Sequence, residues 1–229
     1  MRDLLPEWFE PIAGYILREG LPVTLKLAAL AVTVSLVAGI VLGTILTIRF
    51  LPTRMLIRFY IEVWRGLPIL VTIFIIFFAL PSLGAQFRFD PFTAAAIGLT
   101  LWGSAQVAEA TRGAVQSIPR EQHEAAAALG FGWIGRHGFV ILPQALRRLL
   151  PPMVGLLVNI LQNTTIAQVI GAAELLETGE RSVERLTAPP PIGPGEIHAF
   201  EIYAAVMVVF FLMSFPLTRL AAYLERRLT

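Results

Sequence analysis

The chain has 229 residues, of which 56% are hydrophobic and 15% are charged, and its formal net charge is +2. Soluble domains carry roughly 25% charged residues, so this composition excludes an ordinary soluble domain and favours a membrane protein. The small net charge gives no indication of nucleic-acid binding. Because the sequence contains no cysteine, disulfides, thiol catalysis and cysteine-ligated metals are excluded.

The N-terminal stretch Leu4–Leu17 is amphipathic and contains Trp8, Phe9 and Tyr15. Two interpretations are open: a helix that lies along the outer membrane interface, or a segment that simply leads into the first span. Met1 to Glu10 carries acids, a proline and a tryptophan and lacks the basic-then-apolar order of a cleavable signal peptide, so we do not expect one.

Five segments are predicted to cross the membrane. A bilayer core of ~30 Å needs about 20 mostly apolar helical residues. Uncharged runs that meet or approach this length are Leu27–Ile48, Gly66–Phe87, Pro91–Ala108, Leu149–Ala173 and Ile202–Thr218. We therefore predict an all-α membrane protein with one transmembrane domain over residues 1–229. Its five spans are expected at approximately residues 20–48, 59–82, 91–114, 149–173 and 199–219.

Arginine is concentrated in the connections on one side of these spans. The connection 49–58 holds three arginines, and the third connection and the C-terminal tail hold Arg112, Arg120, Arg136, Arg147, Arg148, Arg219, Arg226 and Arg227. On the other side Arg181 and Arg185 are balanced by glutamates. The positive-inside rule therefore predicts a periplasmic N-terminus and a cytoplasmic C-terminus.

The connection between the third and fourth spans, residues 115–148, is long for a helix bundle. Glu121–Leu129 includes four successive alanines and predicts a helix, and Gly130 follows where a helix would end in a left-handed residue. A second short helix is expected over Ile134–Leu142, before Pro143. Such a unit suits docking into a groove of a partner protein, and a re-entry helix without a partner is the alternative.

Several motifs occur along the chain in a fixed order. They are Glu62-Val63-Trp64-Arg65-Gly66-Leu67-Pro68, Ala108-Glu109 with Arg112-Gly113 and Gln116-Ser117-Ile118-Pro119, Glu124-Ala125-Ala126 with Gly130, Val140-Ile141-Leu142-Pro143-Gln144-Ala145-Leu146-Arg147, and Val169-Ile170-Gly171-Ala172-Ala173-Glu174-Leu175. Together they resemble the polar amino-acid permease group of bacterial ABC importers, with its cytoplasmic EAA loop. Leu67 and Val140 depart from the Thr and Ile that the family usually has.

The resemblance implies a type I importer (MetI-like) permease fold in the inner membrane of a bacterium. Two permease subunits, identical or similar, would pair around the pore. An ATPase dimer in the cytoplasm would bind ATP and Mg²⁺, and a periplasmic binding protein would deliver the amino acid. The EAA loop would couple to the ATPase through Glu124, Ala125, Ala126, Gly130, Leu142 and Pro143. The chain itself has no G-x-x-x-x-G-K-[ST] loop, so it is expected to hold no cofactor and to catalyse no reaction.

Charged residues near the predicted cytoplasmic ends of the spans have the spacing of ion pairs. Glu62 and Arg65 are i,i+3, as are Glu109 and Arg112, and we interpret both pairs as structural or gating elements. For Glu124 two uses remain open: stabilising the start of its helix through the helix dipole, and a charge contact with the ATPase.

The fourth span carries uncharged polar side chains near the predicted bilayer midplane, where transporter sites tend to lie. With polar groups at comparable depth on the third span, they form a predicted substrate pathway of Trp102, Ser104, Gln106, Asn159, Gln162, Asn163 and Thr164. Hydrogen bonding between helices and contact with substrate are both open for these groups. Many relatives have Lys followed by Asp or Asn at Gln162-Asn163, so a site here would be uncharged and suit a neutral polar amino acid.

No enzyme chemistry is visible in the sequence. His123, His137 and His198 do not have metal-ligand spacing, and the serines have no obvious His and Asp companions. The alternative function is an ion-gradient-driven secondary transporter of small polar solutes. It would need a carboxylate or a broken helix at mid-membrane depth, and we find neither signal in the sequence.

Overall fold

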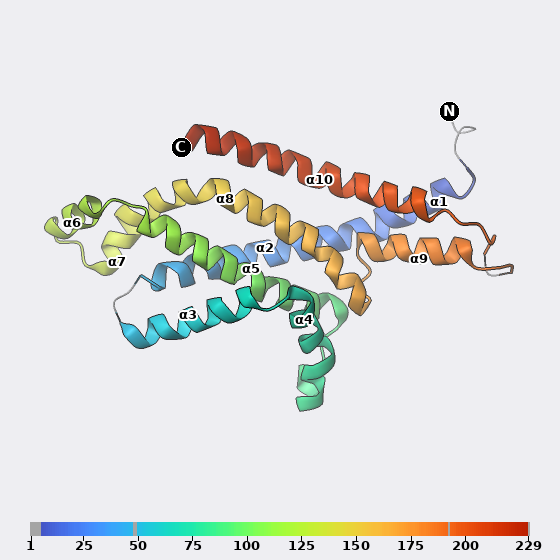
Figure 1. Cartoon of the computed structure of the whole chain (residues 1–229), viewed down its shortest axis with the longest axis horizontal. Helices are drawn as coiled ribbons and strands as arrows, with labels where there is room; N and C mark the ends of the chain where they lie inside the picture. Colours follow the sequence, from blue (N-terminus) through green and yellow to red (C-terminus); the bar gives the residue numbers. More distant parts are fainter. Residues whose placement is uncertain (1–5, 48–49, 192, 229) are drawn as a thin grey trace.

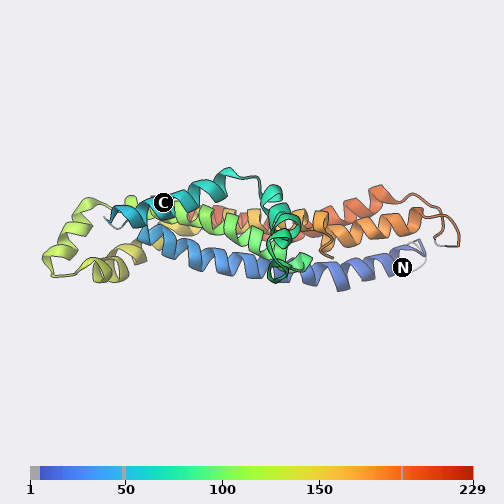
Figure 2. The same cartoon turned by 90° about the horizontal axis from the view of Figure 1, so that it is seen from below.

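The computed structural model describes residues 6–47, 50–191 and 193–228, and within these residues every regular element is helical. The longest helices lie side by side along one long axis, and a short helical segment after residue 68 stands across it (Figures 1 and 2). The start of the amphipathic stretch at Leu4, the predicted end of the first span at Ile48 and Arg49 of the first connection lie outside the described residues.

The first helix is much longer than a bilayer requires. α1 (Phe9–Tyr15), a π-helical turn (Ile16–Gly20) and α2 (Leu21–Ile45) form one helix of 37 residues. At 1.5 Å per residue its length is about 55 Å, compared with ~30 Å for a bilayer core. The amphipathic N-terminal segment therefore leads directly into the first span.

The central contact of the bundle joins α2 to α5 (Pro91–Gln116), which run side by side over most of their lengths. α2 turns a stripe of small residues toward α5: Ala28, Ala31, Ser35, Gly39 and Gly43. A Cβ atom on Gly43 would lie 2.7 Å from the Cβ of Thr111, which shows how closely the two backbones approach. Small residues permit such approach in membrane proteins, where helix association depends on van der Waals contact.

The predicted second span is not one straight helix. α3 (Leu51–Gly66) and the helical segment Ile69–Leu83, which begins with α4 (Ile69–Phe74), meet at an angle of 103°. Leu67 adopts φ −81° and ψ 137°, an extended conformation. The cause is Pro68, because a proline disfavours the helical conformation of the preceding residue and has no N–H for the helix.

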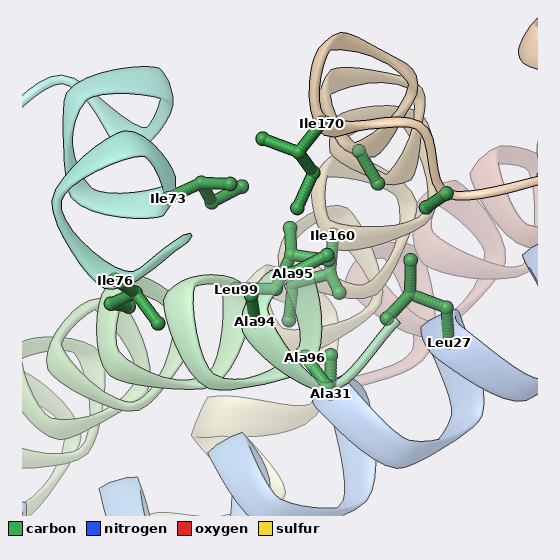
Figure 3. Packing of buried hydrophobic residues seen from close by; sticks show 12 residues of the cluster. Leu27, Ala31, Ile73, Ile76, Ala94, Ala95, Ala96, Leu99, Ile160 and Ile170 are labelled. Carbon is green, nitrogen blue, oxygen red and sulfur yellow. The ribbon is translucent and has the colours of Figure 1, made fainter. Parts of the chain in front are cut away.

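Past the bend, α4 packs against α5 and the chain continues through a π-helical turn (Ile75–Ala79) and two 3₁₀ turns (Leu80–Leu83 and Ala85–Phe87). Gly98 of α5 makes room for Ile73, whose Cγ1 atom would lie 2.6 Å from a Cβ at that position. Side chains from α2, α4, α5 and the fourth span meet in one buried cluster (Figure 3).

The fourth predicted span begins earlier than expected. α7 (Trp133–Gly135), a π-helical turn (Arg136–Ile141), α8 (Leu142–Asn163) and a 3₁₀ segment (Thr164–Ile170) form a continuous helix of 38 residues. The prediction of a separate short helix before Pro143 was therefore wrong, because the helix continues through that proline.

All three π-helical turns are followed by a proline two residues after their last residue, namely Pro22, Pro81 and Pro143. A proline clashes with the carbonyl group four residues before it and cannot donate to that group. In each case this carbonyl belongs to a residue within the π turn, where i→i+5 bonding widens the helix and relieves the clash. This is how the helix passes through Pro143.

In the described part of the chain, three helices are long and apolar enough to cross a membrane, at Phe9–Ile45, Trp133–Ile170 and Ala199–Arg227, and the bent pair would make a fourth. α5 has sufficient length, but it is rich in Ala, Gly, Thr and Ser rather than in large apolar residues. The five spans and the sides of the two termini remain predictions. Figure 1 shows α1 at the opposite end of the long axis from α6 (Arg120–Ala128) and α7.

At the α1 end, α9 (Leu175–Thr187) packs against the π turn of the first helix and against α10 (Ala199–Leu228). Glu174 is fully buried there and caps α9, because its Oε1 accepts the backbone N–H of Glu177 at 2.8 Å. Thr24 of α2 donates to its Oε2 at 3.5 Å. Burial raises the pKa of the Glu174 carboxyl to about 7, and the nearby Glu177 also raises it.

We expect Gly43→Val to lower the stability of the protein, because its side chain would collide with α5. The expected loss in free energy of unfolding is about 1–3 kcal/mol, measured by thermal unfolding of the purified protein in detergent. Gly14→Val is the matched control, since a Cβ at that helical position meets nothing within 4 Å. Equal losses in the two variants would contradict this account of the α2–α5 contact.

We expect the stability of the α9 end to fall as pH rises from about 4.5 to 7. In this window the folded state, in which the pKa of Glu174 is about 7, binds more protons than the unfolded state, whose carboxyl has the ordinary value of 4.5. The integrated loss is on the order of 3 kcal/mol. Glu174→Gln should remove this pH dependence in hydrogen exchange of α9, while Glu180→Gln, at an exposed position of the same helix, should retain it.

Candidate functional site

The end of the molecule opposite to α1 is formed by residues 120–135, which we call the α6–α7 tip (Figure 1). The predicted helix and glycine turn are both present here. Gly130 has φ +84°, its N–H donates to the Ala127 carbonyl at 3.0 Å, and the Phe131 N–H donates to the Ala126 carbonyl at 3.1 Å. This is the Schellman arrangement, in which a left-handed residue reverses the chain after a helix.

One hydrogen bond joins the tip to α8, and another joins α8 to the residue that follows α5. The Gln144 amide of α8 donates to Oε1 of Gln122 in α6 at 3.2 Å. Arg148 of α8 donates to the carbonyl and, at 3.1 Å, to the hydroxyl of Ser117, which follows α5. α6 is therefore tied directly to α8, and α8 is tied to the end of α5.

Below these bonds a small apolar cluster joins the base of the tip to α5. Ile141 and Ala145 of the long fourth helix are buried against Val115 and Ile118. Large apolar side chains on the tip itself have no such cover. Leu129 is 78% exposed and Ile134 is 81% exposed, so the tip presents apolar surface away from the bundle.

The predicted coupling residues occupy different environments on this tip. Ala126 is 2% exposed and faces the bundle, whereas Ala125 is on the outer face. Leu142 is half-buried and Pro143 is exposed. Glu124 pairs with Arg120 of the same helix at 2.8 Å, so in this structure its carboxylate neither caps the helix nor stands free.

Of the two predicted ion pairs, the structure contains one. Arg112 contacts Glu109 in α5 through two hydrogen bonds of 3.0 and 2.5 Å. Glu62 and Arg65 are not paired with each other: Glu62 pairs with Arg58 at 3.0 Å, at i,i+4 spacing. Both partners of that pair are exposed on α3, where such a contact contributes little stability.

Arg65 instead joins the polar side chains of α5. Its Nε donates to Oε1 of Gln106 at 3.2 Å. Toward the tip, Arg112 also donates to Gln116 in addition to Glu109. A line of hydrogen-bonded polar groups therefore follows α5 from Gln106 to its C-terminal end.

Besides Gln106, which accepts from Arg65, two members of the predicted substrate pathway form hydrogen bonds within the structure. The Ser104 hydroxyl lies 2.7 Å from the Tyr60 hydroxyl and joins α5 to α3. Thr164 is buried and donates to the Leu161 carbonyl of its own helix at 2.7 Å. Trp102 is half-buried against the central apolar cluster. The sequence contained no signal for the Tyr60 contact, which depends on how α3 crosses α5.

The remaining polar groups lie together on α8. Asn159 and Gln162 are exposed and Asn163 is half-buried, and within the described residues the side-chain amides of all three form no hydrogen bond; the Thr165 hydroxyl bonds only the backbone carbonyl of Gln162. They lie near the end of α8, on a helix that is otherwise apolar enough to cross a membrane. Unpaired amides on such a helix need water, a second protein surface or a ligand.

Comparison with known proteins places this architecture in a family. Residues 35–229 match the family profile described as binding-protein-dependent transport system inner membrane component. The chain belongs to this family. It is 36% identical over 213 residues to the glutamine transport system permease protein GlnP of Escherichia coli K12, covering 93% of each chain. It is 33% identical to the probable glutamine ABC transporter permease protein GlnP of Bacillus subtilis 168, covering 92% of this chain and 93% of the relative.

The fold is also shared with a solved structure. A chain described as an amino acid ABC transporter with histidines is 28% identical, has a TM-score of 0.81, and aligns over 98% of this chain and 100% of its own. Together with the family match, this similarity confirms the all-helical type I (MetI-like) permease fold that the motifs predicted.

We expect Gly130→Ala to disturb the tip through the backbone alone, because a Cβ at that position meets nothing within 4 Å while φ is +84°. A left-handed alanine costs about 1–2 kcal/mol. The measurement is hydrogen exchange of the amides of Gly130 and Phe131, which should become faster. Gly132→Ala is the control, since Gly132 has φ −65° and equal space. Equal protection of these amides in both variants would refute the assigned role.

Proposed function

We propose that this chain is the membrane-spanning permease subunit of an ATP-driven importer for polar amino acids. The observation that carries the proposal is the α6–α7 tip, an exposed apolar helix pair fixed to two long helices of the bundle. Relatives named as glutamine and amino-acid permeases support the same class of protein. An inner-membrane position in a bacterium follows from the family and from the apolar helices.

The tip is proposed to enter a cleft of an ATPase subunit that binds ATP and Mg²⁺. Leu129, Ile134 and Ala125 offer the apolar contact, and Gly130 reverses the chain between α6 and the start of the long fourth helix. When the ATPase subunits close, the displacement would reach α8 through Gln144 and α5 through the buried Ile141. Hydrolysis would take place on that partner.

The pathway for the amino acid is proposed to follow the exposed amides of α8, where Asn159, Gln162 and Asn163 can bind a polar side chain or the α-amino and α-carboxyl groups. A neutral amino acid such as glutamine suits this face of α8, because Asn159, Gln162 and Asn163 carry no charge. A second permease subunit would complete the pore by placing its own polar helix opposite, and a periplasmic binding protein would deliver the substrate.

The charged groups at the predicted cytoplasmic ends of the spans support ATP-driven transport better than ion-gradient transport. Proton- or sodium-driven transport needs an intramembrane carboxylate whose charge can change, or a broken helix that binds the ion. The expectation of no broken helix was wrong, since the predicted second span bends at Pro68, but the bend carries no acidic side chain. Glu109, which lies in the predicted third span, is held by two hydrogen bonds to Arg112. We interpret this pair, the Arg65–Gln106 contact and the Arg58–Glu62 pair as elements that set the inner gate.

The test is uptake by proteoliposomes that contain this chain, its ATPase and its binding protein. We expect accumulation of glutamine or another neutral polar amino acid that requires internal ATP and that an ionophore does not abolish. Uptake without ATP, or loss of uptake on adding the ionophore, would reject the proposal.

The polar face is tested in the same assay with Gln162→Leu and Asn163→Leu. Loss of a hydrogen bond worth about 0.5–1.5 kcal/mol to bound substrate predicts a roughly threefold to tenfold fall in uptake per variant at limiting substrate. Thr33→Val, an exposed polar position on α2, is the control and should transport normally. Normal transport by both α8 variants would exclude this face as the pathway.

A further inference from the structure

A cavity of about 840 Å³ separates the α6–α7 tip from the adjoining ends of α2 and α3. Its walls come from the end of the first helix, the start of α3, the end of α5, α6 and α7. They comprise Leu46, Thr47, Phe50, Arg54, Val115, Gln116, Arg120, His123, Glu124, Ala127, Trp133, Arg136 and His137. Neither the permease function nor the coupling motif accounts for this cavity.

The lining is strongly cationic. It contains Arg54, Arg120 and Arg136, and its one carboxylate, Glu124, is already paired with Arg120. Arg54 and Arg136 form no ion pair within the described part of the chain. Burial lowers the pKa of His123, and the positive charges of the neighbouring His137 and Arg136 lower it further.

Hydrogen-bond donors are left without acceptors at the same place. The Arg136 Nε and Trp133 Nε1 atoms are buried and have no partner among the described residues. An unsatisfied buried donor costs about 1–3 kcal/mol, more when it is charged. The arginines that line the cavity favour an anion such as phosphate, whose oxygens accept charge-assisted hydrogen bonds.

Apolar surface continues from the mouth of this cavity. Phe50 lines it, and Leu51 and Met55 on the next turns of α3 are 62% and 64% exposed. A neighbouring hollow of about 510 Å³ is lined by Arg54 together with these two side chains, Arg58 and Arg112. A ligand that fits both features has an anionic head and apolar chains. Basic pockets between helices on the cytoplasmic side are sites of this kind.

We propose that this cavity binds the phosphate-bearing headgroup of an anionic membrane lipid, with its acyl chains along the exposed face of α3. Arg54 and Arg136 contact the phosphate from opposite walls, one from α3 and one from the α7 end of the long fourth helix. The lipid thereby ties the tip to the first two helices. This inference does not depend on the transport function, because it concerns binding by the single chain.

The experiment uses the full chain incorporated into vesicles of phosphatidylcholine and phosphatidylglycerol in equal amounts. After extraction in neutral detergent, native mass spectrometry counts the lipids that each protein molecule retains. We expect wild-type protein to retain phosphatidylglycerol and Arg54→Gln/Arg136→Gln to retain about tenfold less, as loss of charge-assisted bonds predicts. Retention should also fall at high salt.

The matched control is Arg219→Gln/Arg226→Gln, which removes two positive charges from α10 outside the cavity. Equal loss in the control, or no preference for phosphatidylglycerol in wild-type protein, overturns the proposal. Arg54→Gln alone, at an exposed position, keeps the test valid if the double variant does not fold. In a second experiment, inorganic phosphate is added at constant ionic strength and the retained lipid is counted again. If it displaces the lipid at equal concentration, the ligand is a soluble phosphate and the lipid assignment fails.

Discussion

The close approach of α2 to α5 is the constraint on which the rest of the structure depends. Glycine and alanine on α2 bring the two backbones together, and Gly98 does the same between α5 and α4. Two further helices pack against α5: α3 through the Tyr60–Ser104 hydrogen bond, and α8 through the buried apolar cluster. In a membrane, apolar side chains gain little from leaving lipid, so van der Waals contact between closely packed helices stabilises the bundle in place of hydrophobic burial.

The same packing makes the α6–α7 tip a mechanical part of the bundle. Gln122 of α6 is bonded to Gln144 of the long fourth helix, and Arg148 of that helix is bonded to Ser117 after α5, so a force on α6 has a direct route to the helices that carry the polar residues. The π turn before Pro143 serves this arrangement, since it lets the α7 part of the tip and the fourth span form one helix. The cationic cavity lies between the tip and the ends of α2, α3 and α5, so an anion bound there would affect how rigidly the tip is held.

The candidate site was predictable where it depends on local chemistry. Four successive alanines followed by glycine predict the α6 helix and its left-handed end, and i,i+3 spacing predicts the Glu109–Arg112 pair. The same spacing rule was wrong for Glu62, because Arg58 lies at the competing i,i+4 position. The partners of Ser104 and Arg65 could not be predicted from local spacing, since they come from another helix, 44 and 41 residues away.

By itself, the sequence determined the membrane class, the family, the helical tip and the uncharged character of the α8 face, because these follow from composition, short motifs and periodicity within one helix. The tertiary structure decided that the second span bends by 103° at Pro68 and that the tip continues into the fourth span. It also decided which polar side chains form hydrogen bonds between helices and which do not. These outcomes depend on contacts between residues far apart in the chain, and no local pattern encodes how two helices cross.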